Sequence, residues 1–357
     1  MLGTALLLVG IACSSSSPKT TPGSRTKTAS TGSGSAQKVT LHLAYFPNLT
    51  HAPALVGVFR NTFTDALGPN VTLDTKTFNA GPDVVTALLN DDIDIAYIGP
   101  NPSVNGYTKS NGEKVRIIAG ATSGGALLIV QGDSNINSAA DLKGKKIATP
   151  QLGNTQDVAL RAYLKANGLS APATGGGDVD VIPTANSDTV NLFKQKQIDG
   201  AWVPEPFATR LVQESGGRAF IDEATLWTST GGKFVTTNVV VRPQFLTDHP
   251  DVVQNFLKGH VEAVQWINQN PAAAKTIANQ AIANINNAKP LAQAILDGAW
   301  AHLTFTYDPI AASLRKGADD AYAVGILTAK PDLTGIYNLD PLNTVLRAQN
   351  LPAVSVQ

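Results

Sequence analysis

The residues of this chain that could do chemistry are small and polar, and they gather in short turns that follow apolar stretches. Three such turns are Gly99 to Ser103, Ser123 to Gly125 and Pro150 to Gln156. The first and third are predicted to begin helices, and a helix N-terminus presents unpaired backbone N–H groups and the positive end of the dipole. Small side chains let an anion approach such groups closely. The pattern favours anion binding, with ordinary helix caps of the same residue types as the alternative.

Motifs for catalysis and for metal binding are absent from the sequence. The chain has no His-Glu-x-x-His motif, no Walker loop, and no cluster of Cys and His with the spacing of metal ligands. Its histidines are scattered, at His42, His51, His249, His260 and His302. Only His51 falls in a turn where it could donate a hydrogen bond to a bound anion. We therefore expect a binding protein rather than an enzyme, with no cofactor and no metal site.

Four further residues complete the predicted lining of a binding cleft. Tyr45 and Asn48 stand at the end of one predicted strand, and Trp202 and Glu205 at the end of another. Trp202 could instead be a core residue. Glu205 could accept from a ligand amine, bind a backbone N–H or close a hinge salt bridge, and we favour a structural role. The predicted ligand-binding residues are Tyr45, Asn48, His51, Gly99, Asn101, Ser123, Gly124, Gly153, Asn154, Thr155, Trp202 and Glu205.

Length and charge narrow the class of protein. The chain has 357 residues, enough for two domains with cores of their own. It is 43% hydrophobic and 15% charged, with 27 basic residues against 27 acidic ones. This balance gives no footprint for nucleic acid and no polybasic patch for a membrane surface. We expect a monomer that binds a small solute.

The N-terminal segment is typical of export. An apolar run from Ala5 to Ala12 precedes Cys13, the single cysteine, and a tract rich in Ser, Thr, Gly and Pro follows. The run is too short to span a bilayer, so residues 1–12 are predicted to be a signal peptide. Its pattern resembles a bacterial lipoprotein signal, which predicts a lipid on Cys13 and a flexible tether over 13–37. The protein would then sit in the cell envelope, periplasmic or on the outer face of the cytoplasmic membrane, with simple secretion as the alternative.

The body alternates between predicted strands and helices, as an α/β protein does. Before the middle of the chain we predict strands at 39–45, 71–78 and 93–98, and helices at 51–63 and from Gly81 onward. A second series has strands at 145–149, 179–182 and 198–203, and helices at 155–166 and 187–196. Everything after Arg242 is expected to be helical, with one apolar stripe formed by Val253, Phe256, Leu257, Val261 and Val264.

One phrase occurs in both series, as Ile93 to Ile98 and as Ile198 to Val203: Ile-Asp-x-Ala, an aromatic residue and an aliphatic one. Its copies are too far apart for a solenoid repeat, so they predict two similar lobes. Apolar runs at 126–130 and 234–241 are predicted to cross between the lobes. Lobe 1 would then hold 38–125 plus 238–357 and lobe 2 would hold 126–237. Ligands of such doubly wound lobes bind at the carboxyl ends of the strands, which predicts a site in the cleft.

A set of local motifs is similar to one known family. The motifs are Tyr45 to Asn48, Ala80 to Asp83, Ile93 to Gly99, Asp141 to Ala148, Gln151 to Thr155 and Trp202 to Phe207. Together they resemble the periplasmic solute-binding proteins of the sulfonate, taurine and nitrate ABC importers. The resemblance implies a type II periplasmic binding protein-like fold that captures a small anion, closes by hinge motion and delivers it to a permease driven by an ATPase. Pro204 stands where much of that family has an aromatic residue.

The resemblance leaves the ligand open. An aliphatic sulfonate such as taurine comes first, followed by nitrate or bicarbonate and then a pyrimidine or riboflavin precursor. A pyrimidine-precursor synthase has a similar fold but looks to require a cysteine-rich motif, which a chain with only Cys13 cannot supply. A tethered sensor without a transporter is the remaining alternative.

Overall fold

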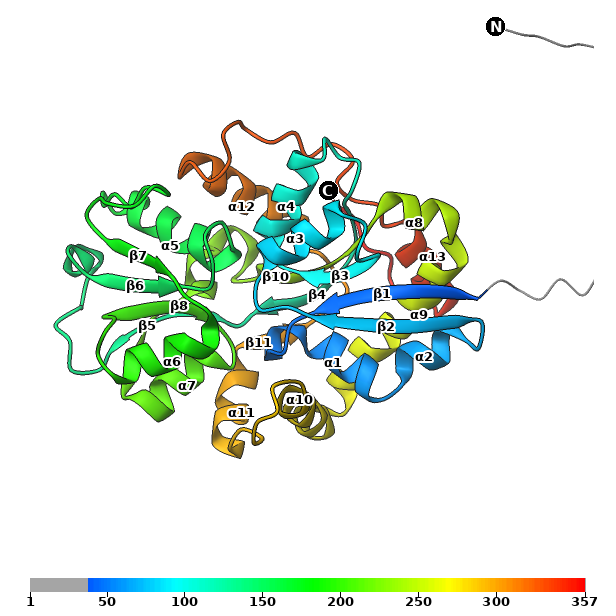
Figure 1. The fold of residues 1–357 in the computed structure, drawn as a ribbon, viewed down its shortest axis with the longest axis horizontal. Helices are drawn as coiled ribbons and strands as arrows, with labels where there is room; N and C mark the ends of the chain where they lie inside the picture. Colours follow the sequence, from blue (N-terminus) through cyan, green and yellow to red (C-terminus); the bar gives the residue numbers. More distant parts are fainter. Residues whose placement is uncertain (1–37, 357) are drawn as a thin grey trace, which may run out of the picture. The chain divides into compact units, whose positions relative to one another are not determined.

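The computed structural model describes residues 38–356, which form two β-sheets with helices packed against both of their faces (Figure 1). In the first sheet β1 is parallel to β2 and β3, whereas β10 is antiparallel to β3 and β4. In order across the sheet its strands are β11 (Leu303–Phe305), β4 (Arg116–Gly124), β10 (Val235–Val241), β3 (Ile95–Ile98), β1 (Val39–Tyr45) and β2 (Val71–Thr77).

The second sheet is also mixed, with β6 parallel to β7 and β8, and β5 antiparallel to β8 and β9. In order across the sheet its strands are β7 (Asp180–Pro183), β6 (Lys146–Thr149), β8 (Gly200–Pro204), β5 (Ala126–Gln131) and β9 (Gly217–Asp222). We call the elements around the first sheet lobe 1 and those around the second sheet lobe 2.

The helices fill the connections between strands and the C-terminal part of the chain. Those of the first 215 residues are α1 (Ala52–Phe59), α2 (Thr62–Leu67), α3 (Gly81–Leu89), α4 (Pro100–Lys109), α5 (Thr155–Ala166), α6 (Asn186–Lys194) and α7 (Phe207–Ser215). Those that follow are α8 (Pro243–Asp248), α9 (Pro250–Gln269), α10 (Pro271–Ile285), α11 (Gln293–Ala301), α12 (Ala311–Ala323) and α13 (Asp340–Ala348). Short 3-10 turns are Leu49–His51, Ala139–Leu142, Glu223–Leu226 and Thr228–Thr230. Within residues 38–356 no helix combines the length and the hydrophobicity that crossing a bilayer requires.

The repeated phrase plays the same part in both lobes. The carboxylate of Asp94, just before β3, accepts from the N–H of His42 in β1 at 3.0 Å, and that of Asp199, just before β8, accepts from the N–H of Lys146 in β6 at 2.8 Å. On its other side, β3 pairs with the antiparallel strand β10, and β8 pairs in the same way with the antiparallel strand β5. The prediction of two similar lobes is confirmed, since five strands follow the same order in each sheet.

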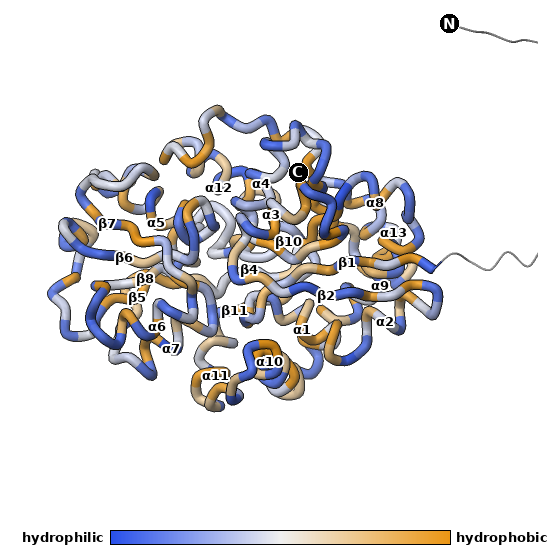
Figure 2. Tube along the Cα trace, viewed as in Figure 1, coloured by the Kyte–Doolittle hydropathy of each residue, from blue (hydrophilic) through white to orange (hydrophobic). Residues whose placement is uncertain are grey.

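Hydrophobic residues alternate onto both faces of the strands, and both faces are covered. In the first sheet Leu41 and Leu43 pack with α9 on one face, while Ala44 and Ala96 pack on the other. The predicted stripe of α9 is buried in the first of these cores, as expected. Figure 2 shows the contrast between the largely hydrophilic edge strand β2 and the hydrophobic strands in the middle of the sheet.

Three details differ from the predicted elements. The helix predicted over 51–63 is divided because Asn61 takes a left-handed conformation, with φ of 60°, between α1 and α2. The expectation that everything after Arg242 is helical is wrong, since β11 adds a strand to the first sheet. The whole of β10 lies in the first sheet, so that sheet begins at Val235, before the predicted boundary at 237.

Two crossings join the lobes, and they lie side by side. Between β4 and β5 the chain passes through Gly124 and Gly125, whose φ angles of 80° and 75° suit glycine. The second crossing enters β10, where Val235 pairs with Ser123 of β4. The predicted signal peptide, lipid-anchored Cys13 and tether lie outside the described residues.

Candidate functional site

A small cavity of about 20 Å³, which we call the inner cavity, lies between the lobes and is lined by both. This volume holds little more than one water molecule. Among the described residues, the cavity walls include no Asp, Glu, Lys or Arg. The lining residues are Phe46, Asn48, Thr50, His51, Asn79, Gly99 and Thr236 from lobe 1, and Asn154, Thr155, Gln156, Asn186 and Pro204 from lobe 2.

Two lobe 1 side chains at the cavity use their acceptor atoms within the protein. The Nδ1 atom of His51 accepts from the backbone N–H of Phe46 at 3.2 Å, and its ring stacks on that of Phe46 with 4.3 Å between centroids. Burial lowers the pKa of His51 to about 3, so the ring is neutral and carries its proton on Nε2. The Oδ1 atom of Asn48 accepts from the hydroxyl of Thr50 at 2.6 Å. Each of these two side chains keeps an N–H group that can donate to a ligand.

Lobe 2 contributes the N-terminus of α5. The N-cap residue Asn154 makes no capping hydrogen bond with its side chain, and its carbonyl accepts the first helical bond, from Val158. The hydroxyl of Thr155 is buried and has no hydrogen-bond partner among the described residues. A buried polar atom without a partner costs free energy that a ligand can recover. This end of the helix is therefore prepared for an acceptor.

The negative charge nearest to this helix end is already neutralised. Asp157 is fully buried and accepts from Gly153 N at 2.9 Å and from the hydroxyl of Thr149 at 3.1 Å. Arg161, one turn further along α5, lies 3.0 Å from it and forms a buried ion pair. The pair fixes the turn before α5 without adding net charge to the site.

The two lobes touch at Gly99 and Thr155. Gly99 is the N-cap of α4 and has φ of −68° and ψ of 158°, the extended conformation expected before a proline. A Cβ atom on Gly99 would lie closer than 3.0 Å to the hydroxyl oxygen of Thr155, a separation that real Cβ atoms do not show. Glycine is needed here because of this approach and not because of the backbone conformation.

Five of the predicted site residues meet at the inner cavity: Asn48, His51, Gly99, Asn154 and Thr155. They come from the turns that follow β1, β3 and β6. Parallel strands end at the same edge of a sheet, and the two edges face each other here, as the fold predicts.

Tyr45 and Trp202 do not reach the cavity, which corrects their predicted placement. Tyr45 packs in the lobe 1 core on the same face of β1 as Leu41 and Leu43. The indole of Trp202 is fully buried in the lobe 2 core, and its Nε1 donates to Glu223 at 2.9 Å. Because both sheets are covered on both faces, alternate side chains of a strand enter one core or the other.

Ser123 and Gly124 belong to the hinge instead of the cavity. The hydroxyl of Ser123 accepts from the N–H of Phe234 at 3.3 Å, and the carbonyl of Gly124 accepts from the hydroxyl of Thr236. These bonds hold the two crossings together. Neither residue lines the inner cavity.

Asn101 and Gly153 also use their polar groups within the protein. The carboxamide of Asn101 donates to the carbonyl of Gly317 in α12 at 2.8 Å, and it lines a separate gap of about 20 Å³. The N–H of Gly153 donates its hydrogen bond to the carboxylate of Asp157. Neither residue lines the inner cavity.

Glu205 is a bridge between the lobes. It is fully buried and accepts from the N–H and hydroxyl of Thr209 at 3.0 and 2.9 Å, at the start of α7. Across the interface, the Nδ1 atom of His302 lies 2.7 Å from its carboxylate. The hydrogen bond to Glu205 raises the pKa of His302, against the opposing effect of burial. The structural role favoured for Glu205 agrees with this geometry.

Sequence reasoning missed several lining residues, of which Asn186 is the most informative. Asn186 is the first residue of α6, shortly after β7, in the same kind of strand-to-helix turn that contains Asn154, so the rule that found one could have found the other. Its Oδ1 is buried without a partner among the described residues. By contrast, Thr236 reaches the cavity from a crossing strand, a placement that no local pattern signals.

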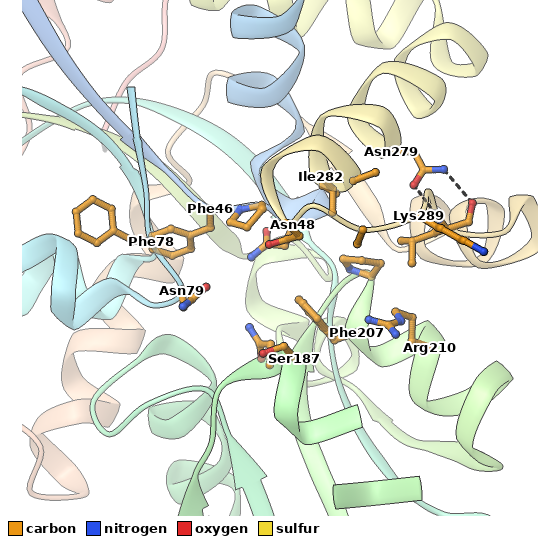
Figure 3. A pocket seen from close by; sticks show the side chains of 17 residues that line it. Phe46, Asn48, Phe78, Asn79, Ser187, Phe207, Arg210, Asn279, Ile282 and Lys289 are labelled. Atoms are coloured by element: carbon orange, nitrogen blue, oxygen red, sulfur yellow. Dashed lines mark hydrogen bonds between the residues drawn. The ribbon is translucent and has the colours of Figure 1, made fainter. Parts of the chain in front are cut away.

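A larger hollow of about 380 Å³, which we call the outer pocket, adjoins the inner cavity (Figure 3). The two share the residues Phe46, Asn48, Asn79 and Asn186. Among residues 38–356, no group of three or more His, Cys, Asp or Glu side chains is placed to hold a metal ion. The arrangement can bind an oxyanion with uncharged donors from both lobes and a helix N-terminus.

Several known proteins with similar sequences or structures are named as binding proteins. The taurine-binding periplasmic protein of Escherichia coli (strain K12) is 29% identical over 236 residues, which cover 66% of this chain and 69% of that protein. The alkanesulfonate-binding protein SsuA from Xanthomonas axonopodis pv. citri, bound to MOPS, superposes with a TM-score of 0.69 at 18% identity, covering 85% of this chain and 99% of that one.

The periplasmic nitrate-binding protein NrtA from Synechocystis PCC 6803 superposes with a TM-score of 0.72 at 17% identity, covering 88% of this chain and 90% of that one. The structural matches show that the chain has the two-lobed α/β fold of these binding proteins. The model of the NMT1-like family matches residues 34–283. Because that match extends over more than half of the sequence, the chain belongs to the NMT1-like family.

Proposed function

We propose that this protein is the extracytoplasmic solute-binding component of an ABC importer, and that it captures a small organic anion, foremost an aliphatic sulfonate. The similar proteins named for taurine, alkanesulfonate and nitrate support this proposal. The anion would bind at the inner cavity, which would have to widen to admit a group larger than one water molecule. It would then hold the lobes together until it is passed to a membrane permease coupled to an ATPase. Such closure around a ligand is a common use of a two-lobed fold with a hinge.

One observation carries the proposal: the hydroxyl of Thr155, at the N-terminus of α5, is buried and has no hydrogen-bond partner within residues 38–356. Thr155 lines the inner cavity, to which His51 and Asn48 of the other lobe offer N–H donors. A sulfonate has three acceptor oxygens and stays ionised, so uncharged donors and a helix dipole suffice to hold it. Nitrate and bicarbonate offer the same kind of acceptor, and they are comparison ligands in the test.

Binding without catalysis is the better account of this site. The lining combines a neutral imidazole with amides and hydroxyls, and it contains no nucleophile activated by an adjacent base. The single cysteine, Cys13, is distant in the sequence from the turns that line the inner cavity. These observations support a solute carrier over a synthase of similar fold.

The proposal is tested by calorimetric titration of the purified protein with short alkanesulfonates, taurine, nitrate, bicarbonate and riboflavin. We expect a sulfonate to bind, and the Thr155→Ala variant to bind it about tenfold to a hundredfold more weakly, as for a lost hydrogen bond to a charged group. Thr86→Ala is the matched control, because Thr86 is an exposed helical threonine on α3 and should leave affinity unchanged. Binding of riboflavin with no binding of any anion would refute the proposal.

The lipid anchor on Cys13 is a separate part of the proposal. In a bacterial host, the protein should fractionate with membranes and the Cys13→Ser variant should be released into the soluble extracytoplasmic fraction. Metabolic labelling with a radioactive fatty acid should mark the parent protein and leave the variant unlabelled. Equal fractionation of both proteins would contradict the anchor while leaving the binding function intact.

A further inference from the structure

The outer pocket continues the inner cavity outward and is far larger, about 380 Å³ against about 20 Å³. A solute whose oxyanion group occupied the inner cavity would have to place the rest of its atoms in the outer pocket. The chemistry of the outer pocket should therefore decide which organic anion the cleft accepts. This step rests on the function proposed above.

Apolar side chains from both lobes line the part of the outer pocket that follows the inner cavity. Figure 3 shows Ile282 of α10, from lobe 1, and Phe207 of α7, from lobe 2, on opposite sides of the space beyond Asn48. Apolar area of this kind favours a hydrocarbon stem over a polar one.

Beyond these apolar residues the pocket ends in two cations. Arg210 of α7 and Lys289, in the connection between α10 and α11, are labelled at the same end of the pocket in Figure 3. Among the described residues, neither the outer pocket nor the inner cavity has an Asp or a Glu in its lining. Glu214 contacts Arg210 at Nε, 2.9 Å away, outside the lining. Arg210 therefore already has a carboxylate partner at Nε, whereas Lys289 has no ion pair among the described residues, and the pocket lining itself offers no carboxylate to a ligand amine.

The connection that carries Lys289 is fixed against the wall of the pocket. Asn279 of α10 is buried, and its carboxamide donates to the carbonyl of Leu291 at 2.9 Å and accepts from the N–H of Leu291 at 2.8 Å, the dashed lines in Figure 3. A further bond runs from Ala288 N to the carbonyl of Ala283 at 2.9 Å. The backbone on both sides of Lys289 is therefore held in place, so pairing with a ligand would not also have to order this connection.

We propose that the outer pocket is a second subsite, which takes the tail of a solute with two negatively charged ends. Its sulfonate group occupies the inner cavity, its apolar stem passes between Phe207 and Ile282, and a carboxylate at its far end pairs with Arg210 and Lys289. An ammonium group at that end, as in an aminosulfonate, would meet two like charges and no carboxylate in the pocket lining. The solute class is a sulfonate that carries a carboxylate in place of an amine.

The test is calorimetric titration of the full chain with three ligands that share one stem: butanesulfonate, and the same stem ending in a carboxylate or in an ammonium group. We expect the carboxylate ligand to bind about tenfold more tightly than butanesulfonate, a difference of about 1.4 kcal/mol, and the ammonium ligand to bind more weakly. In the Arg210→Gln/Lys289→Gln double variant the ratio between carboxylate ligand and butanesulfonate should fall to about one.

The control is the Lys109→Gln/Lys258→Gln double variant, which removes the same charge from exposed positions outside the pocket and should keep the parent ratio. If the pocket variant does not fold, the parent protein still decides the matter, since the carboxylate advantage should shrink as salt screens the partly exposed cations. Equal affinity for butanesulfonate and its carboxylate derivative, or tighter binding of the ammonium ligand, would overturn the subsite while the anion-binding function stood. Failure of all three ligands to bind would overturn both.

Discussion

Alanine at position 99 is expected to weaken anion binding and leave the fold intact. The conformation of Gly99, with φ of −68°, is open to any residue, so alanine introduces no backbone strain. The new Cβ atom would instead collide with the hydroxyl of Thr155 in the closed protein. Either the hydroxyl turns away from the cavity or the lobes stay apart.

The magnitude follows from what the ligand loses. If the Thr155 hydroxyl no longer reaches the anion, one hydrogen bond to a charged group is lost, worth about 1.5 to 3 kcal/mol. Affinity should fall about tenfold to a hundredfold. The thermal stability of the unliganded protein should stay the same or rise slightly, because alanine lowers the entropy of the unfolded chain.

Two partner variants identify the clash as the cause. Thr155→Ala removes the oxygen and leaves the two Cβ atoms 3.6 Å apart, which is ordinary contact, so Gly99→Ala should cost little more in that background. Thr155→Val puts a methyl group where the hydroxyl was, so the clash should persist. The assay is calorimetric titration with the sulfonate that binds best, combined into a double-mutant cycle. An equal loss from Gly99→Ala in the parent and in Thr155→Ala would refute the reasoning.

Three further predictions concern groups outside the inner cavity. His302→Gln should destabilise the protein most at acid pH. The pKa of His302 is raised, so its pairing with Glu205 stabilises the fold fully below about pH 6.5, and this stabilisation is lost as pH rises through the raised pKa. Urea unfolding in which the free energy difference between variant and parent is the same at every pH would contradict this. Burial raises the pKa of Glu223 to about 7, so ionisation costs stability as pH rises, and the stability of Glu223→Gln relative to the parent should improve by up to about 3 kcal/mol between pH 4 and pH 8. Asn279→Ala should release the Lys289 connection and increase its amide hydrogen exchange, and unchanged exchange would count against the clamp.

Much of the fold could be predicted because its signals are local. The helices α5 and α9 carry periodic apolar residues bounded by caps or prolines, and they begin where the sequence indicates. The repeated Ile-Asp-x-Ala phrase predicts matching strands in both lobes. The strand β11 was missed because three residues are too few to show alternation.

The sequence predicts the site residues that follow the ends of strands. It does not predict which residues within a strand point toward the cleft. Asn48, Gly99 and Thr155 follow strands whose ends must meet at the cleft. Tyr45 is the last residue of β1 and Trp202 is in the middle of β8, and both strands have a core on each face. Alternation of side chains along such a strand does not indicate which of them reaches the cleft. The outer pocket depends on the connection after α10, whose course no sequence pattern indicates.

The matching positions of Asp94 and Asp199 bear on how such a protein can change its solute. Each carboxylate ties the central strand of its sheet to a neighbour in the same lobe, so the register of one sheet does not depend on the other. Substitutions in the cleft turns of one lobe can then change the binding site without disturbing the fold of the other lobe. New solute ranges could arise by substitutions confined to one lobe, or by recombination of lobes between relatives at the paired crossings.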